Sequence, residues 1–408
     1  MITNGDGTED KAEEALAIRV AASVGAFSRP EWQGLAGTSR GDRENGYNPF
    51  LSYDFLLSLE ESGCAVGRSG WQGNHLRLET AEGRLVGALP CYLKSHSQGE
   101  YVFDHGWADA FERAGGRYYP KLQASVPFTP VTGPRLLPLA GATDPGAVRA
   151  ALAQGLKAVA DRLGVSSAHV TFAAEADMAA LIGAGYLHRT DQQFHFRNEG
   201  YSSYDDFLTT LASRKRKALK RERREALSGG ISIDWLTGSD LTEAVWDDFF
   251  AFYMDTGGRK WGRPYLNRRF FSLIGERMAE DILLVMARRG GRYIAGAINF
   301  IGSEALYGRN WGCIEDHPFL HFEVCYHQAI DFAIAKGLKV VEAGAQGEHK
   351  LARGYMPVIM HSAHYIAHPG LSKAVRDYLA RERREVAHAG AYLEEHGPFR
   401  KGQAPASD

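Results

Sequence analysis

Cysteine is scarce in this 408-residue sequence, long apolar runs are missing, and neither sign of charge is in clear excess. The four cysteines, Cys64, Cys91, Cys313 and Cys325, form no C-x-x-C pair, which favours reduced thiols over a disulfide framework. No apolar run approaches the roughly 18 residues that a membrane span needs. Residues 1–14 are acidic and polar, unlike a signal peptide. We therefore expect a cytoplasmic protein without a membrane span.

The overall charge identifies no partner. With 47 Lys and Arg residues against 49 Asp and Glu residues, the net charge is −2, so any site for a polyanion has to be a local patch. The hydrophobic fraction of 44% is enough for sizeable cores and excludes a wholly disordered chain. At roughly 150 residues per domain, the length predicts two or three domains.

A diverged internal repeat organises the chain. In each half, a Pro-aromatic-Leu segment ending in Ser or Asn, at 49–52 and 264–267, can cap a predicted helix. A predicted β-hairpin with a Gly-Arg turn follows, over 75–88 and 284–297. Then come third strands at 100–103 and 304–307, helices at 150–164 and 322–337, strands at 169–172 and 339–342, and aromatic strands after Gly185-Tyr186 and Gly354-Tyr355. The shared order predicts a duplicated α/β unit.

The repeat also predicts the boundaries of the units. These are a disordered tail at 1–14, a first unit at 15–199, a basic linker at 200–230, a second unit with a C-terminal helix at 231–400, and a tail at 401–408. Within the linker we predict one helix over 201–227, because Phe207, Leu208 and Leu211 recur at helical spacing and Gly229-Gly230 can end it.

The linker contains eight cations among the eleven residues from Arg214 to Arg224. One interpretation is a solvated helix face. However, like charges at helical spacing repel by a few tenths of a kcal/mol per pair, and a polyanion such as tRNA, a diphosphate or an acidic groove would relieve that repulsion. No aromatic residues interleave with the cations, so this is not a strong nucleic-acid motif. The candidate polyanion contacts are Arg214, Lys215, Lys217, Lys220 and Arg221.

A glycine-rich segment over 342–354 follows the predicted strand at 339–342. Its small residues allow the backbone to approach a ligand, and its polar side chains include an acid, a base and cations. The alternative is a hydrophilic connecting loop. Its candidate site residues are Gln346, Glu348, His349, Lys350 and Arg353.

A third cluster lies at 317–327, where Glu323 and His327 share a helix face. Together with His321 and Cys325 they could be considered metal ligands, but the spacing fits neither H-E-x-x-H nor a zinc finger, so we predict no metal site. In the first unit, the loops around Asp104, and around Tyr118 and Lys121, suit either core packing or substrate binding. No G-x-S-x-G, P-loop or G-x-G-x-x-G stands in the right context, which excludes the corresponding hydrolases, NTPases and dinucleotide enzymes.

The order of the predicted elements resembles the GNAT (acyl-CoA N-acyltransferase) fold, and two such units in one chain resemble the FemABX-like acyltransferases, the FemAB-like family of predicted N-acyltransferases above all. The resemblance covers about residues 47–400 and is most specific at 99–109, 118–123, 127–134, 321–326 and 344–350. It implies an α/β fold of two tandem GNAT-like units, with mixed sheets flanked by helices. It also implies transfer of an acyl or aminoacyl group from a carrier, aminoacyl-tRNA or an acyl-thioester, to an amine such as that of a peptidoglycan precursor or a peptide. The donor would be a co-substrate, and no tightly bound cofactor is expected.

The resemblance suggests roles for individual residues. In the family, the lysine of a Phe-Lys-x-x-Phe-Gly segment is thought to steady the oxyanion, and this chain keeps Lys350 and Gly354 of that segment, with His349 and Arg353 in place of the aromatics. Glu348 or His349 is then the candidate base, with Glu323 in reserve. The candidate substrate contacts are Gln346, Arg353, Arg309, Trp311, Asp104, Tyr118 and Lys121.

Two alternatives use the same scaffold. An acetyl-CoA-dependent N-acetyltransferase would bind the donor diphosphate through a [QR]-x-x-G-x-[GA] loop, and neither 312–322 nor the matching interval of the first unit contains one. A non-catalytic RNA- or polyanion-binding protein would use the basic helix alone.

Overall fold

The computed structural model describes residues 15–37, 46–261, 264–344 and 347–400, so the predicted tails lie outside the described residues. Its strands form an 11-stranded sheet of order β10-β11-β12-β13-β14-β9-β15-β8-β6-β5-β2 and a 4-stranded sheet of order β1-β3-β4-β7. The strands are β1 (Leu16–Ala21), β2 (Trp71–Gly73), β3 (His75–Thr80), β4 (Leu85–Leu89), β5 (Tyr92–Lys94), β6 (Lys121–Ala124), β7 (Leu137–Pro138), β8 (Ser167–Val170), β9 (Leu187–Arg197), β10 (Ile231–Leu236), β11 (Ile282–Arg289), β12 (Arg292–Ile301), β13 (Ala305–Cys313), β14 (Val340–Glu342) and β15 (Met356–Ile366).

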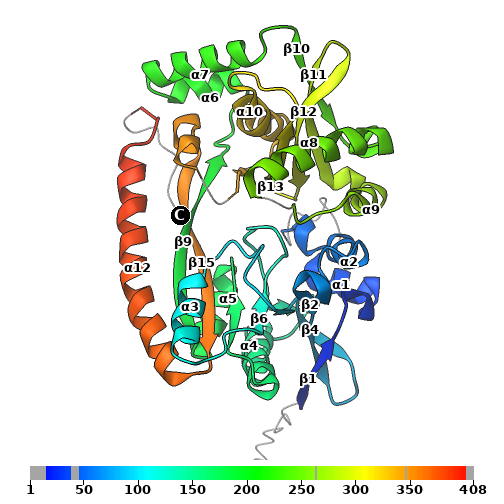
Figure 1. Ribbon diagram of the computed structural model, residues 1–408, viewed down its shortest axis with the longest axis vertical. Coiled ribbons are helices and arrows are strands. Elements are labelled where there is room, and N and C mark those ends of the chain that lie inside the picture. The colour runs from blue at the N-terminus through cyan, green and yellow to red at the C-terminus, as the bar shows by residue number, and fades with distance from the viewer. Residues whose placement is uncertain (1–14, 38–45, 262–263, 345–346, 401–408) are drawn as a thin grey trace, which may run out of the picture.

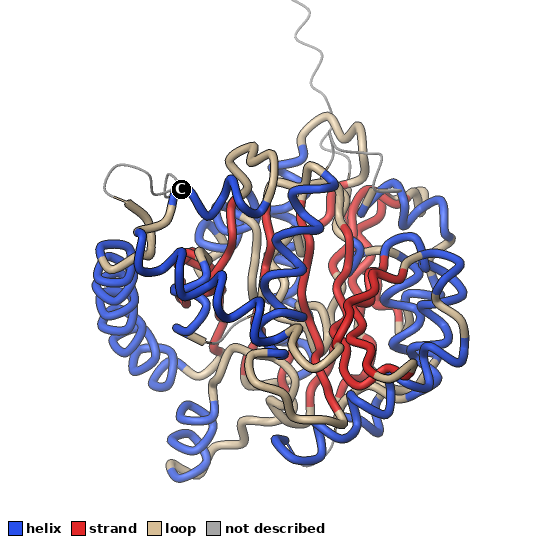
Figure 2. Tube along the Cα trace, turned by 90° about the horizontal axis from the view of Figure 1, so that it is seen from above, coloured by secondary structure: helices blue, strands red, loops and turns tan. Residues whose placement is uncertain are grey.

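Helices flank the strands on both sides, as seen from above in Figure 2, which confirms the predicted mixed α/β class. They are α1 (Arg29–Ala36), α2 (Tyr53–Glu61), α3 (His105–Arg113), α4 (Pro145–Leu163), α5 (Glu175–Gly183), α6 (Tyr204–Thr210), α7 (Ser213–Ala226), α8 (Glu243–Trp261), α9 (Arg268–Met278), α10 (Leu320–Phe322), α11 (Gln328–Lys336) and α12 (Pro369–Glu395), with a π-helix at Glu323–His327 between α10 and α11. In the described part of the chain, none of these helices is both long and apolar enough to cross a membrane.

The duplication is visible in matching local structure. Ser52 accepts a hydrogen bond from the Phe55 backbone N–H at the start of α2, and Asn267 does the same for Phe270 at the start of α9. Helices α4 and α11 both end at glycines in the left-handed region, Gly164 (φ 64°) and Gly337 (φ 66°). These caps satisfy backbone groups that the helix ends would otherwise leave unpaired.

The two units exchange their last strands. Strand β9 of the first unit pairs with β14 of the second, and β15 of the second unit pairs with β8 of the first. The exchanged strands also pair with each other over Met356↔His195 to His364↔Leu187. In Figure 1 the two long strands run side by side between the two halves of the molecule, covered by α12. Main-chain hydrogen bonds therefore join the units into one sheet.

Three predicted elements of the sequence differ from the structure. The strand at 100–103 is wrong: the segment is a loop in which Tyr101 has a φ of +61°, and the third strand is β6. The helix at 201–227 is two helices, because Leu211 is extended and the Ala212 N–H donates to the Pro398 carbonyl. The strand at 169–172 lies two residues earlier, as β8.

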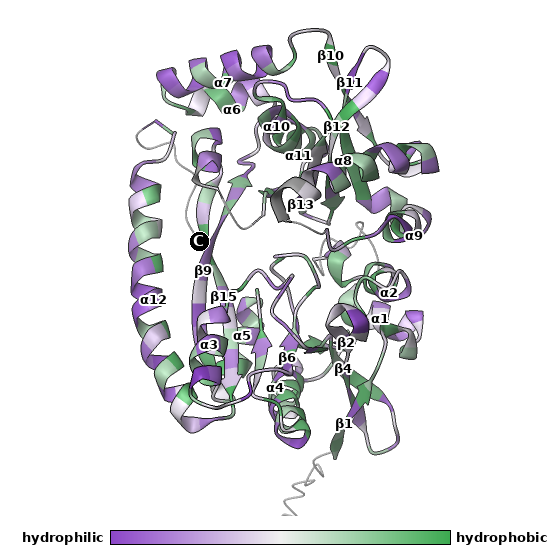
Figure 3. Ribbon diagram, in the orientation of Figure 1, coloured by the Kyte–Doolittle hydropathy of each residue, from purple (hydrophilic) through white to green (hydrophobic). Residues whose placement is uncertain are grey.

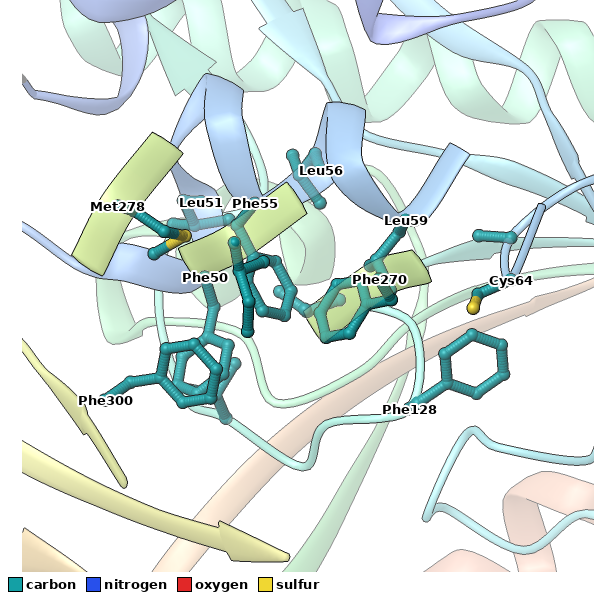
Figure 4. Close-up of a cluster of buried hydrophobic side chains, with 14 of the residues drawn as sticks. Phe50, Leu51, Phe55, Leu56, Leu59, Cys64, Phe128, Phe270, Met278 and Phe300 are labelled. Carbon is teal, nitrogen blue, oxygen red and sulfur yellow. The ribbon is translucent and has the colours of Figure 1, made fainter. Parts of the chain in front are cut away.

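One core cluster spans both units. Phe50 and Phe55 of the first unit pack against Phe270 and Phe300 of the second, with ring centroids 4.7 to 5.7 Å apart (Figure 4). Each fully buried phenylalanine contributes about 1.5–3 kcal/mol relative to an exposed one. Helix α12 also links the units, because its buried Leu371 packs in a cluster with Trp107 and Tyr118.

Candidate active site

The second unit contains a parallel pair of strands that separates partway along. Strands β13 and β14 pair over three residues, from Ala305↔Val340 to Tyr307↔Glu342. Strand β14 then ends, while β13 continues to Cys313. We call the point beyond Tyr307 and Glu342 the strand opening. It places the side chains that follow Tyr307 next to the glycine-rich segment.

Arg309 and Glu342 face each other at the strand opening. Their side chains are only 6% and 10% exposed, and Nη2 of Arg309 lies 3.7 Å from Oε2 of Glu342. Within the described residues, Nε and Nη2 of Arg309 and Oε2 of Glu342 have no hydrogen-bond partner. Buried polar atoms left unsatisfied cost about 1–3 kcal/mol each, so a group bound between them would be stabilised.

Two ionisable groups of the site, Glu342 and Lys350, have pKa values shifted toward neutral pH. Burial raises the pKa of Glu342 to about 7, against the opposing effect of Arg309. Burial and the nearby Arg309 guanidinium lower the pKa of Lys350 to about 8. The Lys350 ammonium donates a hydrogen bond of 2.9 Å to the Gly344 carbonyl, which holds it beside the glycine-rich segment. A carboxyl and an amine that titrate near pH 7 are suited to proton transfer.

Aromatic rings line the second unit near Lys350. The His349 ring nitrogen Nε2 lies 3.0 Å from the Tyr326 hydroxyl, and the His349 ring is 5.6 Å from that of Phe322. The ring of His321 lies 5.2 Å from the ring of Trp311. Tyr326 belongs to the π-helix, an irregularity that is frequent at functional sites.

Two predicted site residues instead anchor the basic helix. Glu323, wholly buried, pairs with Arg223 of α7 at 2.8 Å, and Arg353 pairs with Glu222 of α7 at 2.6 Å. The Arg353 guanidinium also stacks 3.5 Å from the centroid of Phe322. These ion pairs therefore engage Glu323, the reserve candidate base, and Arg353, a candidate substrate contact.

The outer face of α7 keeps its charge exposed, and Figure 3 shows the helix as largely hydrophilic. Lys220 pairs with Asp205 at 2.8 Å, and Arg221 pairs with Glu225 at 2.6 Å. In the described structure the exposed Arg214, Lys215 and Lys217 have no ion pair. The cationic face is therefore smaller than the sequence predicts.

The predicted contacts of the first unit form a buried ionic network, in which Oε1 of Glu100 and Oδ1 of Asp104 have no hydrogen-bond partner among the described residues. The Lys121 ammonium donates to Glu100 at 2.7 Å and also to Asp104, and the Tyr118 hydroxyl donates to Asp104 at 2.7 Å. All four side chains are buried, and His169 lies beside them. Although burial opposes it, Lys121 lowers the pKa of Asp104. This network lies within the first unit and not at the strand opening.

Two predicted site residues of the glycine-rich segment remain, Gln346 and Glu348. Gln346 lies outside the described residues, and Glu348 begins a 3-10 helix that ends at Arg353. Glu342 was not among the predicted site residues, although it is the last residue of the strand before the glycine-rich segment. Nor was His195, which lies opposite Glu342 across β9 and β14, because that neighbour depends on the strand exchange.

The structure is similar to several known ones. FemX matches with a TM-score of 0.51 and 10% identity, covering 86% of this chain and 98% of FemX. A conserved protein of unknown function from Bacteroides thetaiotaomicron VPI-5482 matches with a TM-score of 0.48 and 12% identity, covering 85% and 99%. A tandem GNAT protein from the clavulanic acid biosynthesis pathway has a TM-score of 0.43 and 12% identity, covering 87% and 99%. The predicted fold of two tandem GNAT-like units is confirmed.

A search of curated proteins finds no match to this chain. A family model does match, over residues 23–401, and its description is peptidoglycan biosynthesis/recognition. The match spans nearly the whole sequence, including both units and the basic linker. The chain therefore belongs to the FemAB-like family.

Proposed function

We propose that this protein is an N-acyltransferase that moves an acyl or aminoacyl group from a carrier to an amine, at the strand opening of the second unit. The family match supports an acyl- or aminoacyltransferase in general terms. The observation that carries the proposal for this chain is the buried Arg309–Glu342 ion pair, whose facing atoms lie 3.7 Å apart and have no hydrogen-bond partner among the described residues. Such a pair can accept a proton on one side and donate hydrogen bonds to a developing oxyanion on the other.

The proposed step uses this pair directly. The Glu342 carboxylate takes a proton from the acceptor amine, whose nitrogen then attacks the carbonyl carbon of the donor. A C–N bond forms, and the C–O bond of an ester or the C–S bond of a thioester breaks. The proton on Glu342 passes to the leaving oxygen or sulfur. Arg309 and Lys350 stabilise the negative carbonyl oxygen in between.

His349 and Glu348 remain alternative bases. The His349 imidazole contacts the Tyr326 hydroxyl and is exposed, so it is accessible to an acceptor amine. Glu342 is the stronger candidate because it is buried beside the cations that would stabilise the oxyanion, and a base acts only within hydrogen-bond reach of its proton.

Charge favours aminoacyl-tRNA over an acyl-CoA as donor. The loop between β13 and α10, where a GNAT enzyme would hold a diphosphate, carries Glu315 and Asp316. Glu315 is already engaged by Arg289 at 2.9 Å and Arg292 at 2.6 Å, so those cations are not free for phosphates. The exposed cations of α7 offer a polyanion contact instead. The acceptor class is an amine of a peptidoglycan precursor or a peptide, and no cofactor enters the step.

The test compares Glu342→Gln with the exposed Glu385→Gln as matched control, using charged tRNA and acetyl-CoA as separate donors and a lysine-containing precursor peptide as acceptor. Single-turnover transfer from charged tRNA is expected to fall by about 10²–10⁴ in Glu342→Gln, because general-base catalysis is lost. The control should keep its rate. Full transfer by Glu342→Gln contradicts the assignment. Transfer from acetyl-CoA alone favours the acetyltransferase, and salt-sensitive tRNA binding without transfer favours the polyanion-binding alternative.

A further inference from the structure

Two pairs of histidines join the exchanged strand β15 to strands of the first unit. His169 of β8 lies opposite His364 of β15, and their Nδ1 atoms are 2.7 Å apart; we call these two the inner pair. His188 of β9 and His361 of β15 form the outer pair, with Nε2 and Nδ1 3.0 Å apart. Strand β15 lies between β9 and β8 in the sheet, and Figure 1 shows it running beside β9. The two pairs therefore lie on both sides of the strand that the second unit contributes to the first.

Each pair is a hydrogen bond between two imidazoles, which restricts its protonation state. One of the two facing nitrogens donates its proton, and the other accepts through its lone pair. When both rings are protonated, both facing nitrogens carry protons, so the hydrogen bond is lost and two like charges face each other. The pairs therefore require that the two rings are not both charged.

The inner pair is the less able of the two to accept a charge. His169 and His364 are each only 1% exposed. Burial and the Lys121 ammonium lower the pKa of His169 to about 3, although Asp104 opposes this shift. Burial and the neighbouring His169 lower the pKa of His364 well below its ordinary value. Arg189 of β9 disfavours the charged form of both rings, so a proton on either would be buried among cations.

The outer pair is half-buried and lies between helices α12 and α5. Burial, the His361 ring and Arg383 of α12 lower the pKa of His188. Burial lowers the pKa of His361, against the opposing effect of Glu175 of α5. The Arg383 guanidinium also donates a hydrogen bond of 2.5 Å to the His188 carbonyl, which holds its charge beside the pair. Both pairs are therefore surrounded by groups that, on balance, favour neutral rings.

We propose that the inner and outer pairs form an acid-sensitive latch, which holds β15 in the first unit at neutral pH and releases it as the pH falls. A histidine in a released strand has a pKa of about 6.5, so the released state binds more protons than the held state below that pH. Each histidine then raises the ratio of released to held strand by up to about tenfold per pH unit. Strand β15 follows the 3-10 helix that carries Lys350, so release would also detach that helix from its support. The latch itself does not depend on the proposed function.

The first experiment measures backbone hydrogen exchange of the full-length protein by mass spectrometry, between about pH 7 and pH 5, where histidine titrates. Exchange rates are corrected for the intrinsic effect of pH. The opening ratio for peptides of β15 is expected to rise by up to about 100-fold per pH unit, from the two inner histidines alone. Peptides of β11 and β12 should change much less, and a return to neutral pH should restore the protection of β15. An equal change in β15 and β11 would indicate global unfolding, and that result or an unchanged β15 would overturn the latch.

Two double variants test the histidines themselves. Replacing the inner pair, His169→Gln with His364→Gln, keeps a donor and an acceptor but removes the titration, so the rise in opening per pH unit should shrink at least about tenfold. Replacing the outer pair, His188→Gln with His361→Gln, should remove a smaller part of the response, and it remains informative if the inner variant fails to fold. The matched control is the exposed His388→Gln on α12, which should respond as the unchanged protein does. Full acid response in both double variants, or in the outer variant when it alone folds, would overturn the proposal.

Discussion

The two units contain the same parallel strand pair, but only the second unit places charge where the pair ends. In the first unit β6 and β8 pair up to Ala124↔Val170, whereas in the second β13 and β14 pair up to Tyr307↔Glu342. Two residues beyond the last pair, the first unit has the buried Val126 and the second has Arg309. The same backbone arrangement thus carries an apolar side chain in the first unit and a charged side chain in the second.

The ionic groups of the two units differ in how completely they are satisfied. In the first unit the Lys121 ammonium contacts Glu100, Asp104 and the Ser97 hydroxyl. In the second, Arg309 and Glu342 form an ion pair at 3.7 Å, but Nε and Nη2 of Arg309 have no hydrogen-bond partner among the described residues. Unsatisfied carboxylate oxygens occur in both units, Oε1 of Glu100 and Oδ1 of Asp104 in the first and Oε2 of Glu342 in the second. The difference lies in the cations: the Lys121 ammonium makes direct hydrogen bonds to its partners, whereas the Arg309 guanidinium keeps two nitrogens without one. This difference is consistent with the proposal that the chemistry lies in the second unit.

The largest effect is expected from a variant that breaks the buried ionic network around Lys121 in the first unit. Lys121→Met leaves Glu100 and Asp104 buried without their main cation, and the free energy of unfolding should fall by about 3–5 kcal/mol. Chemical denaturation measures this loss. The matched control is Lys373→Met, which removes an exposed pair with Asp377 and should change stability by less than about 1 kcal/mol. A Lys121→Met protein as stable as the control would show that the network is not structural.

The next largest effect is expected from a variant that removes a positive charge from the second unit. Lys350→Met should reduce the transfer rate by about 10²–10³, the usual cost of losing one preorganised donor to an oxyanion. Stability should change less than in Lys121→Met, because among the described residues the Lys350 ammonium makes one hydrogen bond, to Gly344. Single-turnover kinetics at matched folded fraction test this, with the exposed Lys336→Met as control. An unchanged rate would remove Lys350 from the mechanism.

A smaller effect is the pH dependence of the transfer rate. The base acts as a carboxylate, so kcat/KM should rise as Glu342 loses its proton near pH 7. The oxyanion contact acts as an ammonium, so the rate should fall as Lys350 loses its proton near pH 8. A pH profile should therefore be a narrow bell. Glu342→Gln should remove the rising limb and Lys350→Arg the falling limb, and a profile that keeps both limbs would contradict the assignment.

The smallest effect concerns the basic helix. Neutralising Arg214, Lys215 and Lys217 should reduce the slope of log affinity for charged tRNA against log salt by roughly 2–3, if each contacts a phosphate. Neutralising Lys220 and Arg221, which are paired with Asp205 and Glu225, should change the slope less. Filter binding between 50 and 200 mM salt measures this slope, because a slope of 2–3 over a fourfold change in salt alters the affinity by roughly 16- to 64-fold. Equal changes in the two variants would mean that α7 is not the contact.

Local features were predictable because they depend on neighbouring residues. The caps of α2 and α9 are Ser52 and Asn267 as expected, and Gly164 and Gly337 end their helices. The strand at 100–103 failed for a tertiary reason: Glu100 points inward to Lys121, and Tyr101 adopts a positive φ. The tendency of residues 100–103 to form a strand did not outweigh the buried ion pair between Glu100 and Lys121, 21 positions away in the sequence.

The sequence by itself determined the duplication and the FemAB-like resemblance, and it predicted a role for the glycine-rich segment around Lys350. Only the tertiary structure decided that β9 and β15 change places, that Glu342 faces Arg309, and that Arg353 and Glu323 anchor α7. The physical reason is the sequence distance over which each kind of interaction acts. Caps, turns and helical spacing act within a few residues. Strand exchange and buried ion pairs join residues much farther apart, from 33 positions for Arg309 and Glu342 to 147 for His195 and Glu342, and no local pattern specifies them.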